Sequence, residues 1–173
     1  HLGVRRQRQM CIRDRMQSMA IPAELLLNAA DPAVLVKYSA PLEKLATGQP
    51  LNQDELALFD EASKIPYNLD AWDGYGVERE TILQTAAGHG KRLVSLAGDT
   101  HNAWSGVLDV MSAGAAEPGQ VVGVEFATPG VLSPGIESAF GPGLEPLFTS
   151  YTDGLSYADL SRRGFLDITF HPD

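Results

Sequence analysis

The short run from Leu93 to Ala97 constrains the fold of this chain more than any other stretch of the sequence. It is almost continuously apolar and rich in branched residues, and Gly98 follows it directly, which is typical of a buried β-strand that ends in a loop. Asp99 and His101 lie on that loop. Because a sheet fixes the ends of its strands, ligands and catalytic groups are often found just beyond the carboxyl end of a buried strand. The run therefore predicts a sheet with candidate functional residues at this end.

Asp99 and His101 are separated by a single residue. In extended backbone, side chains at this spacing point to the same side, so both can reach one common point. A carboxylate and an imidazole that converge in this way form half of a metal site. The alternative is structural, because an aspartate after a glycine often bonds to the backbone of its own turn, and a single histidine on a loop is usually at the surface.

Length and charge limit the class of protein. A chain of 173 residues with 44% apolar and 20% charged residues can form one globular domain with a real core. Its formal net charge of −9 argues against a nucleic acid as partner, although a metal ion can still attract a phosphate group to a negative protein. Cys11 is the single cysteine, which excludes an internal disulfide without fixing the redox compartment. No apolar run in the sequence approaches the length of a membrane span.

Residues 1–19 differ in composition from the rest. Their five arginines and one acid give a net charge of +4, so the remaining residues carry −13. The pair Arg5-Arg6 does not indicate a twin-arginine signal, because no apolar segment follows it. The run Met10-Cys11-Ile12-Arg13-Asp14-Arg15 resembles translated adapter sequence. We therefore expect a non-native tail over residues 1–19, with a basic arm as the alternative, and a domain over residues 20–173.

Hydrophobic periodicity predicts an α/β fold. A helix that leads into the buried strand at Leu93 is typical of an α/β crossover, and three strand-like runs follow. Before them, residues 20–66 predict short helices and irregular structure that cover a larger fold, with a first helix that Asp31-Pro32 ends. Trp72 and Trp104 are expected to pack in the core. The predicted helices lie near 23–30, 54–62 and 77–87, and the predicted strands near 92–97, 106–112, 120–127 and 165–170.

Four short blocks follow one another along the chain and carry a resemblance to a known family. They are Asn68-Leu69-Asp70-Ala71-Trp72-Asp73-Gly74-Tyr75, Gly98-Asp99-Thr100-His101-Asn102-Ala103-Trp104, Val124-Glu125-Phe126-Ala127-Thr128-Pro129-Gly130 and Tyr157-Ala158-Asp159-Leu160-Ser161-Arg162-Arg163-Gly164-Phe165. One such block is a weak signal, whereas four in order at these spacings are specific. Together they resemble the C-terminal part of a PhoD-like alkaline phosphatase, in the calcineurin-like metallophosphoesterase superfamily. The resemblance covers roughly residues 20–173.

The resemblance implies a partial metallophosphoesterase-type sandwich of mixed β-sheets with flanking helices. By likeness to the Gly-Asp-x-His block of the family, Asp99 and His101 are expected to be metal ligands and catalytic residues. The family's metals are iron and calcium; imidazole suits iron, and a carboxylate suits calcium. Asn102 is expected to orient the site or to contact phosphate. Asp73 is a second candidate for substrate binding, although capping of the following helix is an equal alternative.

The sequence also departs from the family pattern. The family's bridging aspartate, its asparagine–histidine pair and its further ligands belong before the present region, and the sequence shows no trace of them. The other histidines are His1, His89 and His171, and none forms a second Asp/His cluster. His89 is expected at the surface, and Cys11 is not assigned as a ligand. We therefore expect a truncated chain that carries part of the site, binds metal weakly and is inactive alone.

Two classes of function remain open at this stage. The resemblance implies a hydrolase that cleaves small phosphate esters, of the alkaline phosphatase or phosphodiesterase type, and that works outside the cytoplasm. The alternative is a non-catalytic β-rich binding or surface module that retains the strand pattern. Hydrolysis by a Ser/His/Asp triad is disfavoured, because the sequence contains no Gly-x-Ser-x-Gly elbow.

Overall fold

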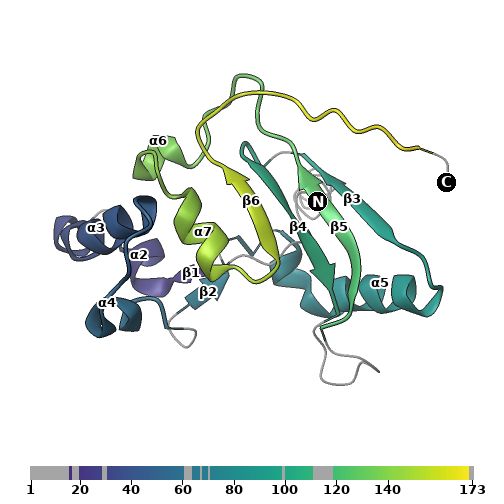
Figure 1. Cartoon of the computed structure of the whole chain (residues 1–173), viewed down its shortest axis with the longest axis horizontal. Helices are drawn as coiled ribbons and strands as arrows, with labels where there is room; N and C mark the ends of the chain where they lie inside the picture. Colours follow the sequence, from purple (N-terminus) through teal and green to yellow (C-terminus); the bar gives the residue numbers. More distant parts are fainter. Residues whose placement is uncertain are drawn as a thin grey trace, which may run out of the picture.

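A mixed four-stranded sheet forms the centre of the structure, with the strand order β3-β5-β4-β6 (Figure 1). The computed structural model describes residues 16, 20–28, 31–60, 64–66, 68–69, 71–98, 100–110 and 119–171. β3 runs parallel to β5, whereas β4 lies antiparallel between β5 and β6. The strands are β3 (Leu93–Ala97), β4 (Ala103–Asp109), β5 (Val121–Ala127) and β6 (Leu155–Asp159). The predicted α/β class with a mixed sheet and flanking helices is confirmed.

The register divides the side chains of the sheet between two faces. We name them the covered face and the open face, because helices pack on the first, and the second exposes apolar side chains. The covered face carries the rows Leu93–Gly123–Leu108, Ser95–Glu125–Gly106 and Ala97–Ala127–Trp104. The open face carries Val94, Leu96, Val124, Phe126, Ser105, Val107 and Tyr157.

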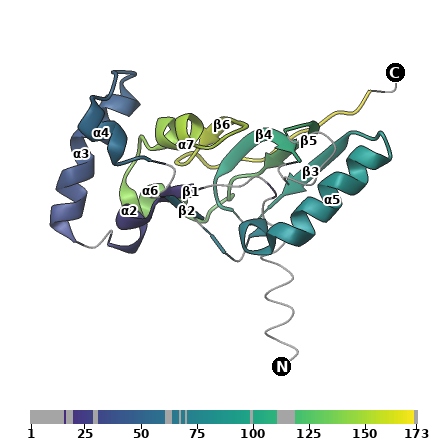
Figure 2. The ribbon, with the colours of Figure 1, turned by 90° about the horizontal axis from the view of Figure 1, so that it is seen from below.

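Two helices build the core against the covered face. α5 (Gly76–Gly88) lies along the sheet (Figure 2). Its fully buried Leu83 belongs to one hydrophobic cluster with Leu108. α7 (Glu145–Tyr151) brings Phe148 against Trp104, with the two rings edge to face and their centroids 5.2 Å apart. Each such side chain contributes roughly 1.5–3 kcal/mol when it leaves water. The predictions of α5 and of Trp104 as a packing residue are confirmed.

A helical layer beside α7 forms the second part of the fold (Figure 1). A small cluster that includes Tyr38, Phe59 and Leu147 holds this layer to α7. The side chain of Asn52 accepts a hydrogen bond from Glu55 N, and the Glu55 carboxylate accepts one from Asn52 N, both at 2.8 Å. This capping box confirms the predicted helix start. The layer comprises β1 (Ala20–Pro22), α2 (Ala23–Leu27), α3 (Pro32–Ala46), α4 (Gln53–Ala57) and β2 (Lys64–Pro66).

The helix α3 was not predicted, because Pro32 was interpreted as a breaker. It instead occupies the first helical position, where a missing N–H does no harm, and Asp31 caps the helix by accepting a bond from Ala33 N at 2.9 Å. The predicted helices 23–30 and 54–62 end earlier, at Leu27 and Ala57. Their last predicted positions, 29–30 and 61–62, lie outside the described residues.

Two strand predictions need correction. The predicted strand 106–112 begins earlier, at Ala103, and positions 111–112 lie outside the described residues. The predicted strand 165–170 is wrong, because this segment is extended but belongs to no sheet, and Phe165 is 84% exposed. The fourth strand of the sheet is β6, which follows α7 through a turn at Gly154 with φ of 76°. The run 120–127 forms β5, as predicted.

Within the part of the chain that the structure describes, no helix has the length and apolar character needed to cross a membrane.

Candidate functional site

Three loops meet at one edge of the four-stranded sheet. β3, β5 and β6 all end there, and β4 begins there, because β4 is antiparallel to both of its neighbours. The described residues of these loops are 98 and 100–102, 128–136, and 160–164. The carboxyl ends of parallel strands are the usual place for ligands in such sheets. This edge is therefore the candidate site, and it carries the loop that the sequence indicated.

His101 lies at this edge in an unusual backbone conformation. Its φ is +58°, which places a non-glycine residue in the left-handed region at a cost of roughly 1–2 kcal/mol. Such conformations persist where the surroundings enforce them, often at functional sites. The imidazole Nδ1 lies 3.1 Å from the carbonyl oxygen of Pro134 and must donate to it, because a carbonyl only accepts. This bond requires a proton on Nδ1, and in the neutral ring the lone pair is then on Nε2, the arrangement found in histidines that bind metals.

Asp99, the other predicted metal ligand, lies outside the described residues. Its convergence with His101 therefore stays a prediction. Within the described ranges, no three or more His, Cys, Asp and Glu side chains gather in a way that would hold a metal ion. The hydrogen bond of His101 fits a metal ligand.

Asn102 is buried, with 3% of its surface exposed. Its Nδ2 donates to the carbonyl of Thr100 at 2.7 Å, and its Oδ1 accepts from Ile136 N at 3.0 Å. Both ends of the amide are thus engaged by backbone groups of two different loops. Of the two predicted roles for Asn102, these bonds favour orientation of the site. A contact with substrate stays a prediction.

Asp73 lies half-buried on the 3-10 helix η2 (Trp72–Tyr75), just before α5. The N-cap of α5 is Tyr75, and no side chain caps the helix, so the capping role considered for Asp73 is wrong. The block is tightly packed, because a Cβ at Gly74 would lie only 1.9 Å from the Leu69 carbonyl oxygen. Substrate binding by Asp73 stays a prediction.

Two ion pairs between described residues lie at this edge of the sheet. Asp159 accepts hydrogen bonds from Arg162 N at 3.0 Å, from the Arg162 guanidinium at 2.5 Å and from Ser161 N at 3.3 Å. Burial alone would raise the pKa of Asp159, but these hydrogen bonds outweigh it and hold the pKa below its ordinary value. Arg163 bonds to Glu137 at 2.5 Å, which lowers the pKa of that carboxyl. Sequence reasoning missed these ion pairs, although the sequence shows Arg162-Arg163 close to the acid Asp159.

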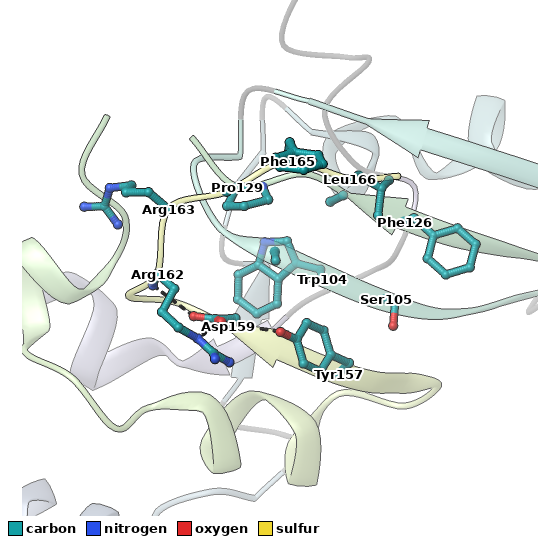
Figure 3. A pocket seen from close by; sticks show the side chains of 13 residues that line it. Trp104, Ser105, Phe126, Pro129, Tyr157, Asp159, Arg162, Arg163, Phe165 and Leu166 are labelled. Carbon is teal, nitrogen blue, oxygen red and sulfur yellow. Dashed lines mark hydrogen bonds and ion pairs between the residues drawn. The ribbon is translucent and has the colours of Figure 1, made fainter. Parts of the chain in front are cut away.

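A pocket of about 390 Å³ opens between the open face and the chain that follows β6 (Figure 3). The ion pair of Asp159 and Arg162 forms its polar side, and the hydroxyl of Tyr157 lies 3.4 Å from Asp159 (Figure 3). The pocket adjoins the candidate loop, because Ala103 in its wall follows His101 by two residues. Its apolar lining includes Trp104, Phe126, Pro129, Phe165 and Leu166.

The remaining candidate donors do not join this edge. His89 is exposed at the C-cap of α5, as predicted, and His171 is exposed near the end of the described chain. His1 and Cys11 lie outside the described residues. Among the described histidines, His101 is thus the one that lies on the loops of the candidate site.

Comparison with known proteins identifies the family. The model of the PhoD-like phosphatase family matches residues 32–173. Among solved structures, the chain is similar to one described as "Structure of PhoD", with a TM-score of 0.48 and 18% sequence identity, over 86% of this chain and 30% of that one. The chain thus spans less than a third of the length of that protein, and no curated protein matches it significantly. Because the family match covers most of the sequence, the chain belongs to the PhoD-like phosphatase family.

Proposed function

We propose that this chain forms part of a metal-dependent hydrolase of phosphate esters. The observation that carries the proposal is the hydrogen bond from His101 Nδ1 to the Pro134 carbonyl, which favours the ring tautomer that can coordinate a metal through Nε2. Membership of the PhoD-like phosphatase family supports the same reaction class.

Asp99 and His101 are the proposed ligands, and they would be the catalytic residues through the metals that they hold. The imidazole of His101 suits iron, and the carboxylate of Asp99 suits calcium. When bound, such metals polarise the phosphoryl oxygens and provide an activated nucleophile. Asn102 orients the loop of His101, while Asp73 is proposed to contact substrate from η2.

Further ligands are proposed to come from polypeptide outside these residues. Two donors do not hold a dinuclear centre, because such a centre needs several more ligands and supporting hydrogen bonds. The substrate is proposed to be a small phosphate ester, and the complete enzyme is proposed to work outside the cytoplasm, as the family resemblance implies.

The first experiment measures the chain alone. We expect the purified 173-residue protein to hydrolyse a chromogenic phosphate ester weakly or not at all when calcium and iron are supplied. The reason is that Asp99 and His101 are the two metal ligands proposed in this chain, and a dinuclear centre needs several more. Robust turnover would show that the chain holds more ligands than Asp99 and His101.

The second experiment uses a longer phosphatase that contains this region. His101→Ala should abolish most of its activity, because a metal ligand is lost. His89→Ala is the matched control, since His89 is exposed on α5, and it should leave activity unchanged. An active His101→Ala enzyme would remove this loop from the reaction. Inactivity of the longer protein with a full metal complement would favour a non-catalytic binding module instead.

A further inference from the structure

Two hydrogen bonds fasten the turn of His101 to a loop that is more than thirty residues away in the sequence. The Pro134 carbonyl accepts from His101 Nδ1, and Ile136 N donates to Asn102 Oδ1. Asn102 also donates to Thr100, on the other side of His101. The backbone of 134–136 is therefore fixed to His101 itself and, through Asn102, to both of its neighbours.

Gly135 lies between Pro134 and Ile136, the two residues that make these hydrogen bonds. A Cβ at this position would lie 2.3 Å from Asn102 Oδ1, 2.6 Å from Glu137 Oε2 and 2.6 Å from the Leu160 carbonyl oxygen. These separations are far inside van der Waals contact, and the Leu160 oxygen belongs to the backbone, so it cannot swing aside like a flexible side chain. Only glycine allows the loop to approach the His101 turn this closely.

We infer that the segment Pro134–Ile136, locked in place by Asn102 and Gly135, is a positioning device that sets the tautomer of His101. The hydrogen bond that one ring nitrogen makes decides which nitrogen keeps the proton. With the Pro134 carbonyl in place, the proton stays on Nδ1. Loss of that carbonyl removes the acceptor that favours a proton on Nδ1, so the form with a proton on Nε2 becomes more populated; that form cannot coordinate through Nε2.

This inference deepens the proposed function and rests on the proposed role of His101 as a metal ligand. Asn102 and Gly135 are positioning residues, because they act on His101 and not on the substrate. The device explains why a buried asparagine directly follows the histidine and why the opposite loop carries glycine between proline and isoleucine. It also accounts for the left-handed backbone at His101, which the bonds on both sides hold in place.

The first test is the tautomer itself, read by long-range proton–nitrogen NMR on the metal-free chain at a pH where the ring is neutral. We expect the His101 ring to show the Nδ1–H pattern, with its signals assigned by their loss in His101→Asn. A predominant Nε2–H pattern would overturn the inference without any further variant. Because no metal is present, this result is independent of whether His101 binds one.

The second test changes the device. Gly135→Ala and Asn102→Ala should each remove the excess of the Nδ1–H form. Ser138→Ala is the matched control, because it deletes a 2.8 Å hydrogen bond from Ser138, at the start of the next helix, to the Gly135 carbonyl and leaves the side chains of His101 and Asn102 unchanged. It should keep the wild-type pattern.

Folding of each variant is checked by thermal unfolding, and if Gly135→Ala does not fold, Asn102→Ala carries the test. A folded variant of either kind that keeps the wild-type tautomer would contradict the inference, as would an equal change in Ser138→Ala. If the tautomer behaves as expected but His101→Ala leaves a longer phosphatase active, the positioning device stands and the proposed ligand role fails.

Discussion

The two faces of the four-stranded sheet carry similar apolar residues in very different surroundings. On the covered face, Leu108 has no exposed surface and packs with Leu83 of α5. On the open face, Leu96 of the edge strand β3 is 57% exposed. The alternation of the strands decides which residues share a face. Whether that face is buried depends on which other elements pack against it.

The polar groups differ between the faces in the same way. Glu125 on the covered face is 1% exposed and accepts hydrogen bonds from Met16 N at 2.5 Å and from the Ser95 hydroxyl at 2.9 Å. Tyr157 on the open face is 45% exposed and lines the pocket under the chain that follows β6. The covered face therefore holds a buried, hydrogen-bonded carboxylate, whereas the open face offers an accessible surface beside the candidate site.

The largest effect is expected from Leu108→Ala. It should lower the free energy of unfolding by about 2–5 kcal/mol, because a fully buried leucine leaves a cavity. Leu96→Ala is its counterpart on the open face and should cost no more than about 1 kcal/mol, since most of that side chain is already in water. Urea unfolding of both variants measures the difference. Equal losses would mean that the open face is buried in solution.

The next effect concerns the buried carboxylate. Glu125→Ala should lower the free energy of unfolding by about 1–3 kcal/mol, because the donors from Met16 and Ser95 lose their acceptor. On the open face, Ser105→Ala should change stability by no more than about 0.5 kcal/mol. The same denaturation assay applies. A neutral Glu125→Ala would show that water replaces the carboxylate on the covered face.

A smaller effect is expected at acid pH from Asp159, at the edge where the open face meets the loops. Its pKa is below the ordinary value in the folded protein. The resulting stabilisation is present above the unfolded pKa of about 3.9 and is lost as the pH falls through the folded value. Asp159→Asn should therefore lower stability by about 1–2 kcal/mol at pH 7 and much less once the carboxyl is protonated. Asp167→Asn, at an exposed acid, is the control and should not change the acid profile.

The smallest effect on stability is expected from Leu96→Lys. Stability should change by about 0.5 kcal/mol or less, because the side chain already faces solvent. Binding of the dye ANS should fall, because this dye reports accessible apolar surface. Leu96→Met should leave the dye signal unchanged. Unaltered dye binding in the lysine variant would place the accessible apolar surface elsewhere.

Local signals predicted part of the fold correctly. β3, β5 and α5 were predicted because short apolar runs, turn residues and helical periodicity depend only on residues that are close in the sequence. The segment 165–170 alternates as well as many strands do, yet it joins no sheet, while β6 takes the edge position beside β4. Alternation shows that a segment is able to pair. It does not show which of two candidates reaches a partner.

The candidate site shows the same limit. The spacing of Asp99 and His101 indicated the loop, and the exposure of His89 was predicted from its glycine neighbours. The bond from His101 to Pro134 joins positions 33 apart, and the bond from Ile136 to Asn102 joins positions 34 apart. No local pattern encodes such pairs, because they arise only when β3 and β5 end at one edge.

The positive φ of His101 affects how its chemistry should be probed. Asparagine and glycine adopt the left-handed backbone at a small cost in free energy. The cost is larger for alanine and larger again for a β-branched residue such as valine. His101→Asn therefore removes the imidazole while keeping the shape of the turn, and His101→Val would disturb both together. A mutational scan at this position would rank replacements by backbone tolerance as well as by metal affinity. For that reason His101→Asn is the substitution that best separates loss of the imidazole from disturbance of the backbone turn.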